Sequence, residues 1–64
     1  MHWVHLDVEE IVAETDAAFL LLLEDGEEVW IPLSQIDQPE LYEKGDQDVT
    51  ISVTQWIAEQ KDLA

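Results

Sequence analysis

Apolar and polar residues alternate at the start of the chain. Residues 4–9 read Val-His-Leu-Asp-Val-Glu, and a period of two is typical of a β-strand with one buried face. At Glu9-Glu10 the apolar phase shifts, so that Ile11 and Ala13 fall on the other parity. The pattern therefore predicts a strand over His2 to Glu14, with a β-bulge or a bend at Glu9-Glu10.

Two further strands are predicted, joined by short turns. Ala17 to Leu23 is continuously apolar, which indicates a strand covered on both faces. Asp25-Gly26 predicts a hairpin, because a type I′ turn needs positive φ at both central residues and these residue types tolerate it. Glu28 to Leu33 is the third predicted strand, and Pro32 suits its end or an edge position. Thr15-Asp16 offers a similar turn between the first two strands.

Two-residue turns fix the register of both predicted hairpins. They pair Leu22 with Val29 and Ala13 with Ala18. One sheet face then collects the apolar residues Ile11, Ala13, Ala18, Leu20, Leu22, Val29 and Ile31. The other face collects Val12, Phe19, Leu21, Leu23 and Trp30, together with Val4, Leu6 and Val8 if no bulge intervenes. Because both faces are apolar, closure into a small barrel would cover the first. The C-terminal helix, the curled first strand or a second copy of the chain would cover the other.

The second half of the chain predicts a loop and a fourth strand. Residues 34–45 carry turn signals, and Pro39 suits the start of one helical turn over Glu40 to Glu43. Val49 to Val53 alternates apolar with polar residues and reads as a strand.

A helix is predicted at the end of the chain. Thr54 is a typical N-cap for a helix over Gln55 to Leu63. Trp56 and Ile57, with Leu63, are expected to face the sheet. The fold class that follows is one domain over residues 1–64, mainly β with a short C-terminal helix. We expect a small SH3-like or partly open antiparallel barrel of about four to five strands.

Composition and charge limit the partners. Apolar residues make up 47% of the 64 residues, which indicates a folded domain. With 2 Lys+Arg and 16 Asp+Glu, the formal net charge is 2 − 16 = −14. This charge excludes direct binding to nucleic-acid phosphates and disfavours anionic membranes. The chain shows no signal peptide and no apolar run of membrane-spanning length, so the expected location is the cytoplasm, here of a bacterial host cell.

Catalytic and metal chemistry find little support in the sequence. His2, His5 and Asp7 carry ligand types that suit Zn²⁺ or Ni²⁺. The other interpretation is an N-terminal strand with polar residues on its solvent side, and no spacing motif supports the metal. Ser34 has neither a base nor a Gly-x-Ser-x-Gly setting. We therefore predict no enzyme activity, no catalytic or metal-binding residue and no cofactor.

The negative charge is the strongest functional signal. B-DNA carries one charge per ~1.7 Å of its axis, so 14 charges match roughly 24 Å of duplex. A compact body with this charge can occupy a nucleic-acid-binding surface of another protein. The alternative is that acidity only keeps the protein soluble. The candidate partner-binding residues are Asp7, Glu9, Glu10, Glu24, Asp25, Glu27, Glu28 and Trp30.

Three tryptophans in so short a chain, Trp3, Trp30 and Trp56, have two interpretations. Each can belong to the core. Trp30 can instead anchor an interface, since large aromatic residues often carry binding energy.

Three segments of the sequence resemble a group of known proteins, and this resemblance implies an origin and a function. The run Glu28 to Ile36 (Glu-Val-Trp-Ile-Pro-Leu-Ser-Gln-Ile), the strand Val49 to Val53 and the segment Trp56 to Lys61 resemble small acidic proteins encoded by phages and prophages. Members share a Gly hairpin, a Trp-Ile-Pro-x-Ser strand end and a C-terminal helix that contains Trp. They often carry Lys where Leu33 stands, and this chain is more acidic. The resemblance implies phage origin, and small acidic phage proteins are often inhibitors of host proteins.

Two functions from different classes follow. The first is a phage-encoded inhibitor of a host antiviral-defence or nucleic-acid-handling protein, which binds a basic surface through acids that mimic nucleic acid. The alternative is a homodimeric structural or adaptor module that binds through Trp30 and its apolar neighbours, with acidity serving solubility only. Dimerisation is expected in either case, because an unstapled core of this size is marginal.

Overall fold

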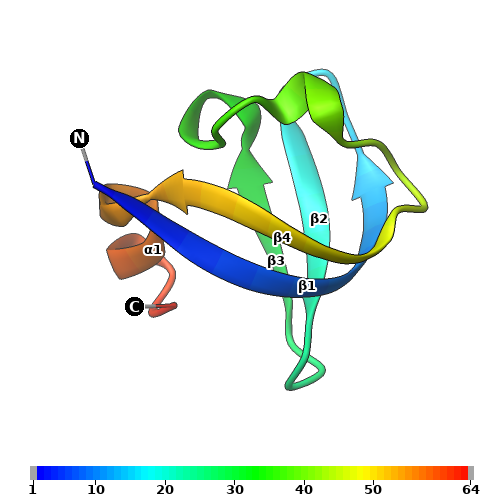
Figure 1. Cartoon of the computed structure of the whole chain (residues 1–64), viewed down its shortest axis with the longest axis horizontal. Coiled ribbons are helices and arrows are strands. Elements are labelled where there is room, and N and C mark those ends of the chain that lie inside the picture. Colours follow the sequence, from blue (N-terminus) through cyan, green and yellow to red (C-terminus); the bar gives the residue numbers. More distant parts are fainter. Residues whose placement is uncertain (1, 64) are drawn as a thin grey trace.

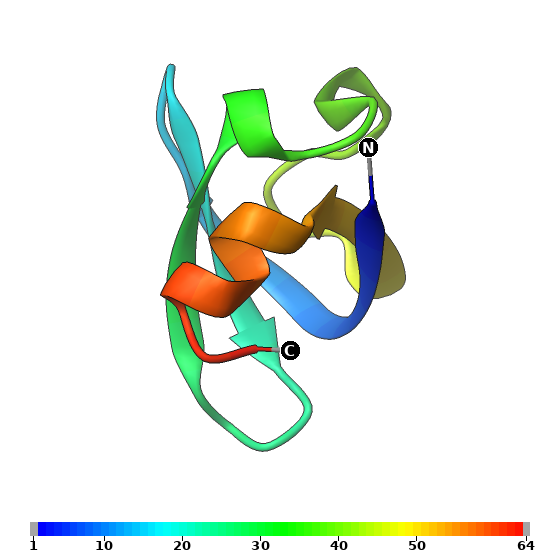
Figure 2. The same cartoon turned by 90° about the vertical axis from the view of Figure 1, so that its left-hand side faces the viewer.

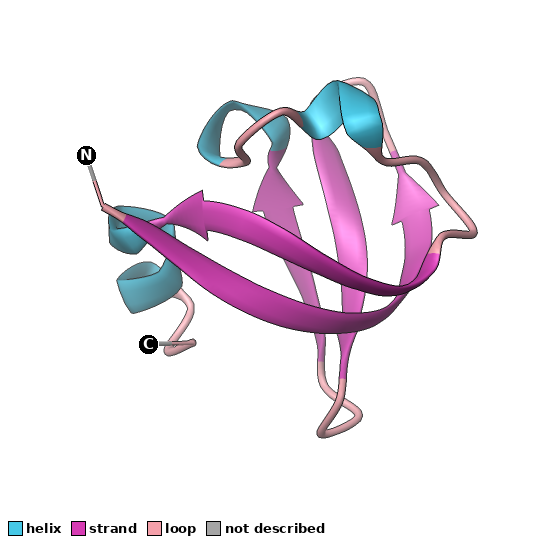
Figure 3. Cartoon of the chain, viewed as in Figure 1, coloured by secondary structure: helices cyan, strands magenta, loops and turns pink. Residues whose placement is uncertain are grey.

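The computed structural model describes residues 2–63 of the chain. All strands are antiparallel and form one open sheet in the order β3-β2-β1-β4 (Figures 1 and 3). The elements are β1 (Trp3–Glu14), β2 (Ala18–Leu23), β3 (Glu28–Pro32), the 3₁₀ turns η1 (Leu33–Gln35) and η2 (Pro39–Leu41), β4 (Gln47–Thr54) and α1 (Gln55–Gln60). This mainly β architecture with a short C-terminal helix confirms the predicted fold class.

β1 is the long central strand, and it belongs to both halves of the sheet. Its first part, from Trp3 to Glu10, pairs with β4, and its second part, from Val8 to Glu14, pairs with β2. The strand curves strongly, so that β2 and β3 cross behind the β1–β4 ribbon (Figure 1). One sheet can therefore fold over its own inner face, as a partly open barrel does.

Bulges in β1 accompany this curvature. The register with β2 shifts between Val8 and Glu10, which confirms the bulge expected from the phase change at Glu9-Glu10. A second shift lies between Ile11 and Ala13 and was not predicted. Each extra residue increases the local bend of the strand. Beside the second bulge, the Ile11 amide donates to the Asp46 carbonyl at 2.9 Å and the Ile11 carbonyl accepts from the Gly45 amide at 2.8 Å.

The β2–β3 turn differs from the prediction by one residue. The Gly26 amide donates to the Leu23 carbonyl at 2.9 Å, and Gly26 alone takes a positive φ, of 88°. A three-residue loop with Gly in the left-handed position replaces the expected type I′ turn. Asp25 avoids positive φ and instead accepts a hydrogen bond from the Glu27 amide at 3.0 Å. Leu21 consequently pairs with Val29, not with Trp30.

The β1–β2 turn is also displaced by one residue. The Thr15 amide donates to the Ala18 carbonyl at 2.8 Å, so that the loop residues are 16 and 17. Thr15 Oγ1 accepts from the amides of Ala17 and Ala18, at 3.2 and 3.1 Å. A threonine hydroxyl that bonds the backbone two and three residues ahead stabilises such a turn. Ala13 therefore pairs with Leu20 and not with Ala18.

These shifts change which residues are buried together. A one-residue slip moves a strand's whole side-chain set to the opposite face. Val29 and Ile31 lie on the inner face with Phe19 and Leu21, whereas the sequence register placed them with Leu20 and Leu22. The buried core consists of Leu6, Val8, Ile11, Phe19, Leu21, Leu23, Val29, Ile31, Ile36, Ile51, Val53, Ile57 and Ala58.

α1 covers one end of this core. It lies where β1 begins and β4 ends (Figure 2). Thr54 is the N-cap, as predicted, and its Oγ1 accepts from the Ile57 amide at 3.2 Å. Ile57 is buried, and Leu63 packs against the core. Trp56 was expected to face the sheet, but its side chain is 58% exposed.

The segment between β3 and β4 closes a further side. Pro39 begins the short helical turn η2, as expected, although it is a 3₁₀ turn that ends at Leu41. Ile36 is buried and forms an isolated bridge with Val53, which ties the loop to the free edge of β4. The Tyr42 hydroxyl donates to the Thr50 carbonyl at 3.1 Å. In the part of the chain described, no helix is long and apolar enough to cross a membrane.

Candidate binding surface

Acidic side chains from three separate segments meet at one end of the molecule. Glu24, Asp25 and Glu27 lie in the β2–β3 turn, and Glu28 begins β3. Residues Glu9, Glu10, Leu22, Gln47 and Asp48 line one shallow hollow between β1, β2 and β4. We call the seven carboxylates of this region the acidic end: Glu9, Glu10, Glu24, Asp25, Glu27, Glu28 and Asp48.

Strand pairing connects the hollow to the turn. Leu22 is the cross-strand partner of both Glu10 on β1 and Glu28 on β3. Directly paired residues share a sheet face and stand side by side. Adjacent strands lie ~4.8 Å apart, so the two glutamates flank Leu22 at a separation of roughly 10 Å. Glu9, Glu10, Glu28 and Asp48 thus lie around Leu22 and the hollow, and Glu24, Asp25 and Glu27 extend this negative charge into the adjacent turn.

The fold tolerates this cluster because water screens it. Two unit charges ~10 Å apart in water repel by only ~0.4 kcal/mol. Glu24, Glu27 and Glu28 are all exposed, as are Glu9 and Asp48. The two basic residues of the chain, Lys44 and Lys61, lie in the η2–β4 loop and after α1. The acidic end therefore keeps its charge available to a partner.

Two of the predicted acids have structural roles. Asp25 Oδ1 caps the β2–β3 turn through the Glu27 amide. Asp7 lies two residues before Glu9 on the same exposed face of β1, at the border of the acidic end, and its Oδ1 accepts from the Thr50 hydroxyl at 3.2 Å. The structure thus places six predicted carboxylates in the acidic end, with Asp7 at its border and hydrogen-bonded to β4.

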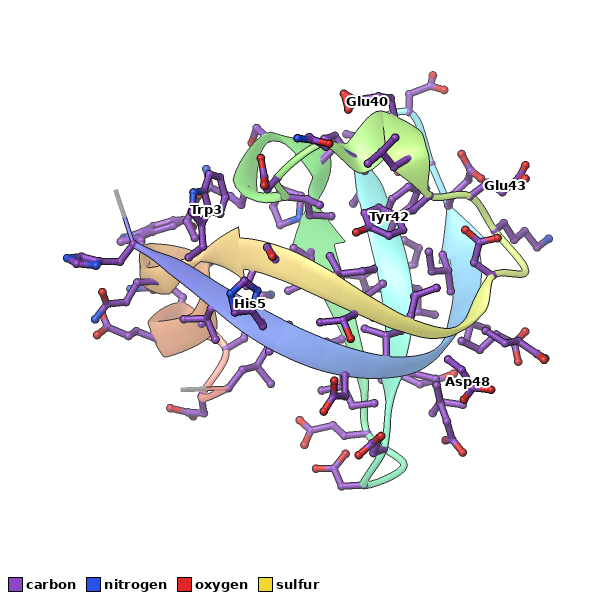
Figure 4. All side chains as sticks on the ribbon, in the orientation of Figure 1. Trp3, His5, Glu40, Tyr42, Glu43 and Asp48 are labelled. Carbon is purple, nitrogen blue, oxygen red and sulfur yellow. The ribbon has the colours of Figure 1, made fainter. Side chains whose placement is uncertain are left out.

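The histidine and aspartate side chains of the metal hypothesis bond to β4 instead. His5 Nδ1 lies 2.7 Å from Ser52 Oγ, as His5 projects from β1 in Figure 4. His2 lies beside α1 instead. Within residues 2–63 no three His, Asp or Glu side chains form a group suited to hold a metal ion.

Trp30 lies next to the acidic end, on the outer face of the sheet. Its cross-strand partner is Leu20, which in turn pairs with Ala13 on β1. Trp30 is two residues from Glu28 and so shares its face of β3. The indole is 43% exposed. Of the two interpretations offered by the sequence, the core position is wrong for Trp30.

A second hollow lies at the opposite end of β4. It encloses about 420 Å³ and is lined by His2, Gln35, Thr54, Gln55, Trp56 and Glu59. The hydroxyl of Thr54 donates to Gln35 Oε1 at 2.7 Å, and Gln55 Nε2 donates to Glu59 Oε2 at 3.2 Å. These polar side chains form hydrogen bonds with one another. The exposed Trp56 is therefore the largest apolar group that this hollow offers to a ligand or partner.

Sequence reasoning missed two kinds of residue at the surface. Asp48 is far from the other acids in sequence, and only the pairing of β4 with β1 brings it to Glu9 and Glu10. Leu20 and Leu22 were assigned to a covered face, and only the true register places them beside Trp30. The run of four leucines from Leu20 to Leu23 gave no alternation from which to choose a face.

No family model, no curated protein and no solved structure matches this chain. The resemblance to phage proteins is therefore still a prediction.

Proposed function

We propose that this protein binds a basic surface of another protein and occupies it in place of nucleic acid. The acidic end supplies the charged contacts, with Trp30 at its border. The single observation that carries the proposal is the clustering of seven carboxylates, from β1, the β2–β3 turn, β3 and β4, around one end of the sheet.

Electrostatics support a protein partner with a basic site. A clustered negative field attracts a positive surface over a Debye length, which is ~8 Å at physiological ionic strength. It accelerates the encounter of the two proteins and fixes their orientation. The surfaces that carry such positive charge most densely are those that bind nucleic-acid backbones.

The size of the molecule supports the same partner. Its principal extents are 28 × 25 × 16 Å. The 14 net charges correspond to roughly 24 Å of B-DNA axis. The body thus carries about the charge of a duplex of its own length. A cleft that accepts a short duplex could accept a body with this charge.

The resemblance to phage proteins supports a target class. On that basis the partner is a host antiviral-defence or nucleic-acid-handling protein, and the outcome of binding is inhibition. The chain itself carries no reaction in this proposal, because a blocked site needs only occupancy. A bacterial cytoplasm is the expected location.

A charge-reversal experiment tests the proposal. Glu24→Lys, Glu27→Lys and Glu28→Lys together change the net charge by +6, from −14 to −8. Asp25 is kept because it caps the turn. Tagged wild-type protein should retain basic nucleic-acid-binding proteins from a bacterial lysate, and added duplex DNA should release them. The triple variant should retain at least about tenfold less, since each lost contact costs roughly 1 kcal/mol.

A matched variant separates local charge from total charge. Glu40→Lys, Glu43→Lys and Glu59→Lys also give −8, but these acids lie outside the acidic end. Glu40 and Glu43 lie on the opposite side of the molecule from the β2–β3 turn (Figure 4). This variant should retain most of the binding. Equal loss in both variants, or captured protein that duplex DNA does not release, would refute the proposal.

A further inference from the structure

Next to the acidic end, the sheet carries an apolar surface that the core does not use. It consists of Ala13, Ala18, Leu20, Leu22 and Trp30, which we call the outer face. The first four are half-buried and Trp30 is exposed. None of them belongs to the buried core or to the partly buried side chains packed against it, within the part of the chain that the structure describes.

Strand register makes the outer face continuous. Leu20 stands between Ala13 and Trp30 in one row across β1, β2 and β3. Leu22 occupies the next row toward the turn, and Ala18 the row on the other side. Along β2 these rows extend over four residue steps, which is ~14 Å. An apolar surface of this kind, bordered by polar residues, is typical of a protein-binding site.

The charges around the outer face indicate which kind of partner can bind there. Glu10 and Glu28 flank Leu22 at one end, and the exposed Asp16 lies in the turn at the other end. A second copy of the chain would place acid against acid in either orientation, since both ends are negative. The complementary partner is apolar at its centre and basic at its ends.

The edge of the sheet argues against a strand as that partner. β3 is an edge strand, and its last residue, Pro32, has no N–H to offer to an added strand. A helix laid across a sheet face needs no backbone pairing and is the usual cover for such a face. About 9 residues of helix span ~14 Å.

We propose that the outer face binds a basic amphipathic helix of the partner protein, with Trp30 as its central contact and the acidic end paired to the helix's Lys or Arg side chains. This inference rests on the proposed function and adds the form of the partner's binding element. Apolar residues spaced at i, i+3, i+4 and i+7 would lie on Leu20, Leu22 and Trp30.

Two synthetic peptides of equal positive charge test this inference by titration calorimetry. One has Leu at i, i+3, i+4 and i+7 with Lys elsewhere, and the other is oligolysine. The Leu–Lys peptide should bind at least about tenfold more tightly than oligolysine. Trp30→Ala should weaken its binding at least about tenfold, because central aromatic contacts dominate such interfaces. Trp30→Phe should restore most of the affinity.

Trp56→Ala is the matched control, since Trp56 is 58% exposed but lies on α1. It should change affinity by less than about twofold. Thermal melting checks that each variant is folded. Equal affinity for both peptides, or equal effects of the two tryptophan variants, would overturn the helix inference while leaving the proposed function intact. Failure of both peptides to bind would count against both.

Self-association is the competing cover for the outer face. The small core made dimerisation the expectation from sequence, but the acids at both ends of the outer face oppose it, so sedimentation of the wild-type protein should give a monomer. A dimer that Trp30→Ala dissociates would show that a second copy occupies the outer face, and would overturn the inference.

Discussion

Leu20 and Leu21 are neighbours in β2 with opposite surroundings. Leu21 is 0% exposed and lies in the core against the inner face, whereas Leu20 lies on the outer face beside Trp30. Their identical chemistry makes them a direct test of the register. Truncation of the inward-facing side chain leaves a cavity, because the surrounding core relaxes only partly.

Leu21→Ala should lower the free energy of unfolding by about 2–5 kcal/mol. Leu20→Ala should lower it by less than about 1 kcal/mol, because its side chain does not pack against the core. Urea denaturation followed by far-ultraviolet circular dichroism measures both. The register predicted from a two-residue turn at Asp25-Gly26 would instead place Trp30, and not Val29, on the same sheet face as Leu21. Equal costs for the two leucine variants would contradict the observed register.

Candidate site residues were predictable where their chemistry is local. The proximity of Glu24, Asp25, Glu27 and Glu28 could be predicted from sequence, because a tight turn keeps neighbours in sequence together in space. Asp7 borders the acidic end on β1, where its carboxylate accepts a hydrogen bond from the Thr50 hydroxyl of β4. Asp48 was not among the predicted residues, because only long-range strand pairing brings it to the acidic end.

At the scale of elements, α1 is the one that depends most on a single residue. It is only six residues long, too short to be stable without its cap and its packing. Thr54 both accepts from the Ile57 amide and donates to Gln35 Oε1 at 2.7 Å, which joins the helix to η1. The elements that close this end of the core therefore share one hydroxyl group.

Thr54→Ala should cost about 1 kcal/mol of stability, which is typical for loss of an N-cap. For a domain of this size the melting temperature should fall by about 4–8 °C. Thr54→Ser keeps the hydroxyl and should retain most of that stability. Differential scanning calorimetry of both variants provides the comparison. A fall of similar size in the serine variant would show that packing of the methyl group, and not the cap, is responsible.

The existence of the four strands, of η2 and of α1 was predictable, whereas η1 and the turn geometry were not. Alternation identified β1 and β4, and Thr54 marked the helix start. Both hairpin loops differ from the prediction by one residue. Thr15 pairs with Ala18 and hydrogen-bonds the β1–β2 loop instead of belonging to it. In the β2–β3 turn, Asp-Gly is compatible with a two-residue turn and with the three-residue loop observed. The loop observed requires positive φ at Gly26 alone, which relieves Asp25 of that conformation.

At the scale of the whole molecule, the charge of −14 opposes the compact state. The repulsion per pair is small, but it sums over many pairs within a body 28 Å long. Salt reduces it when the Debye length becomes shorter than the molecule. Stability should therefore depend on ionic strength even without a partner.

Raising sodium chloride from about 20 to about 200 mM shortens the Debye length from roughly 20 to roughly 7 Å. The melting temperature of the wild-type protein should rise by several degrees. The two triple lysine variants, both at −8, should show a smaller rise. Scanning fluorimetry at graded salt concentrations measures this. A melting temperature that does not change with salt would contradict the role assigned to self-repulsion.

The sequence by itself determined the class of fold and the strong negative charge. Period-two alternation, a capped helix and 16 acids against 2 basic residues require no tertiary information, because each reflects local geometry or total charge. Tertiary structure decided which strand face is buried, since a one-residue slip reverses every side chain of a strand. It also decided that acids distant in sequence form one surface beside Trp30, because only strand pairing brings β1, β3 and β4 together there.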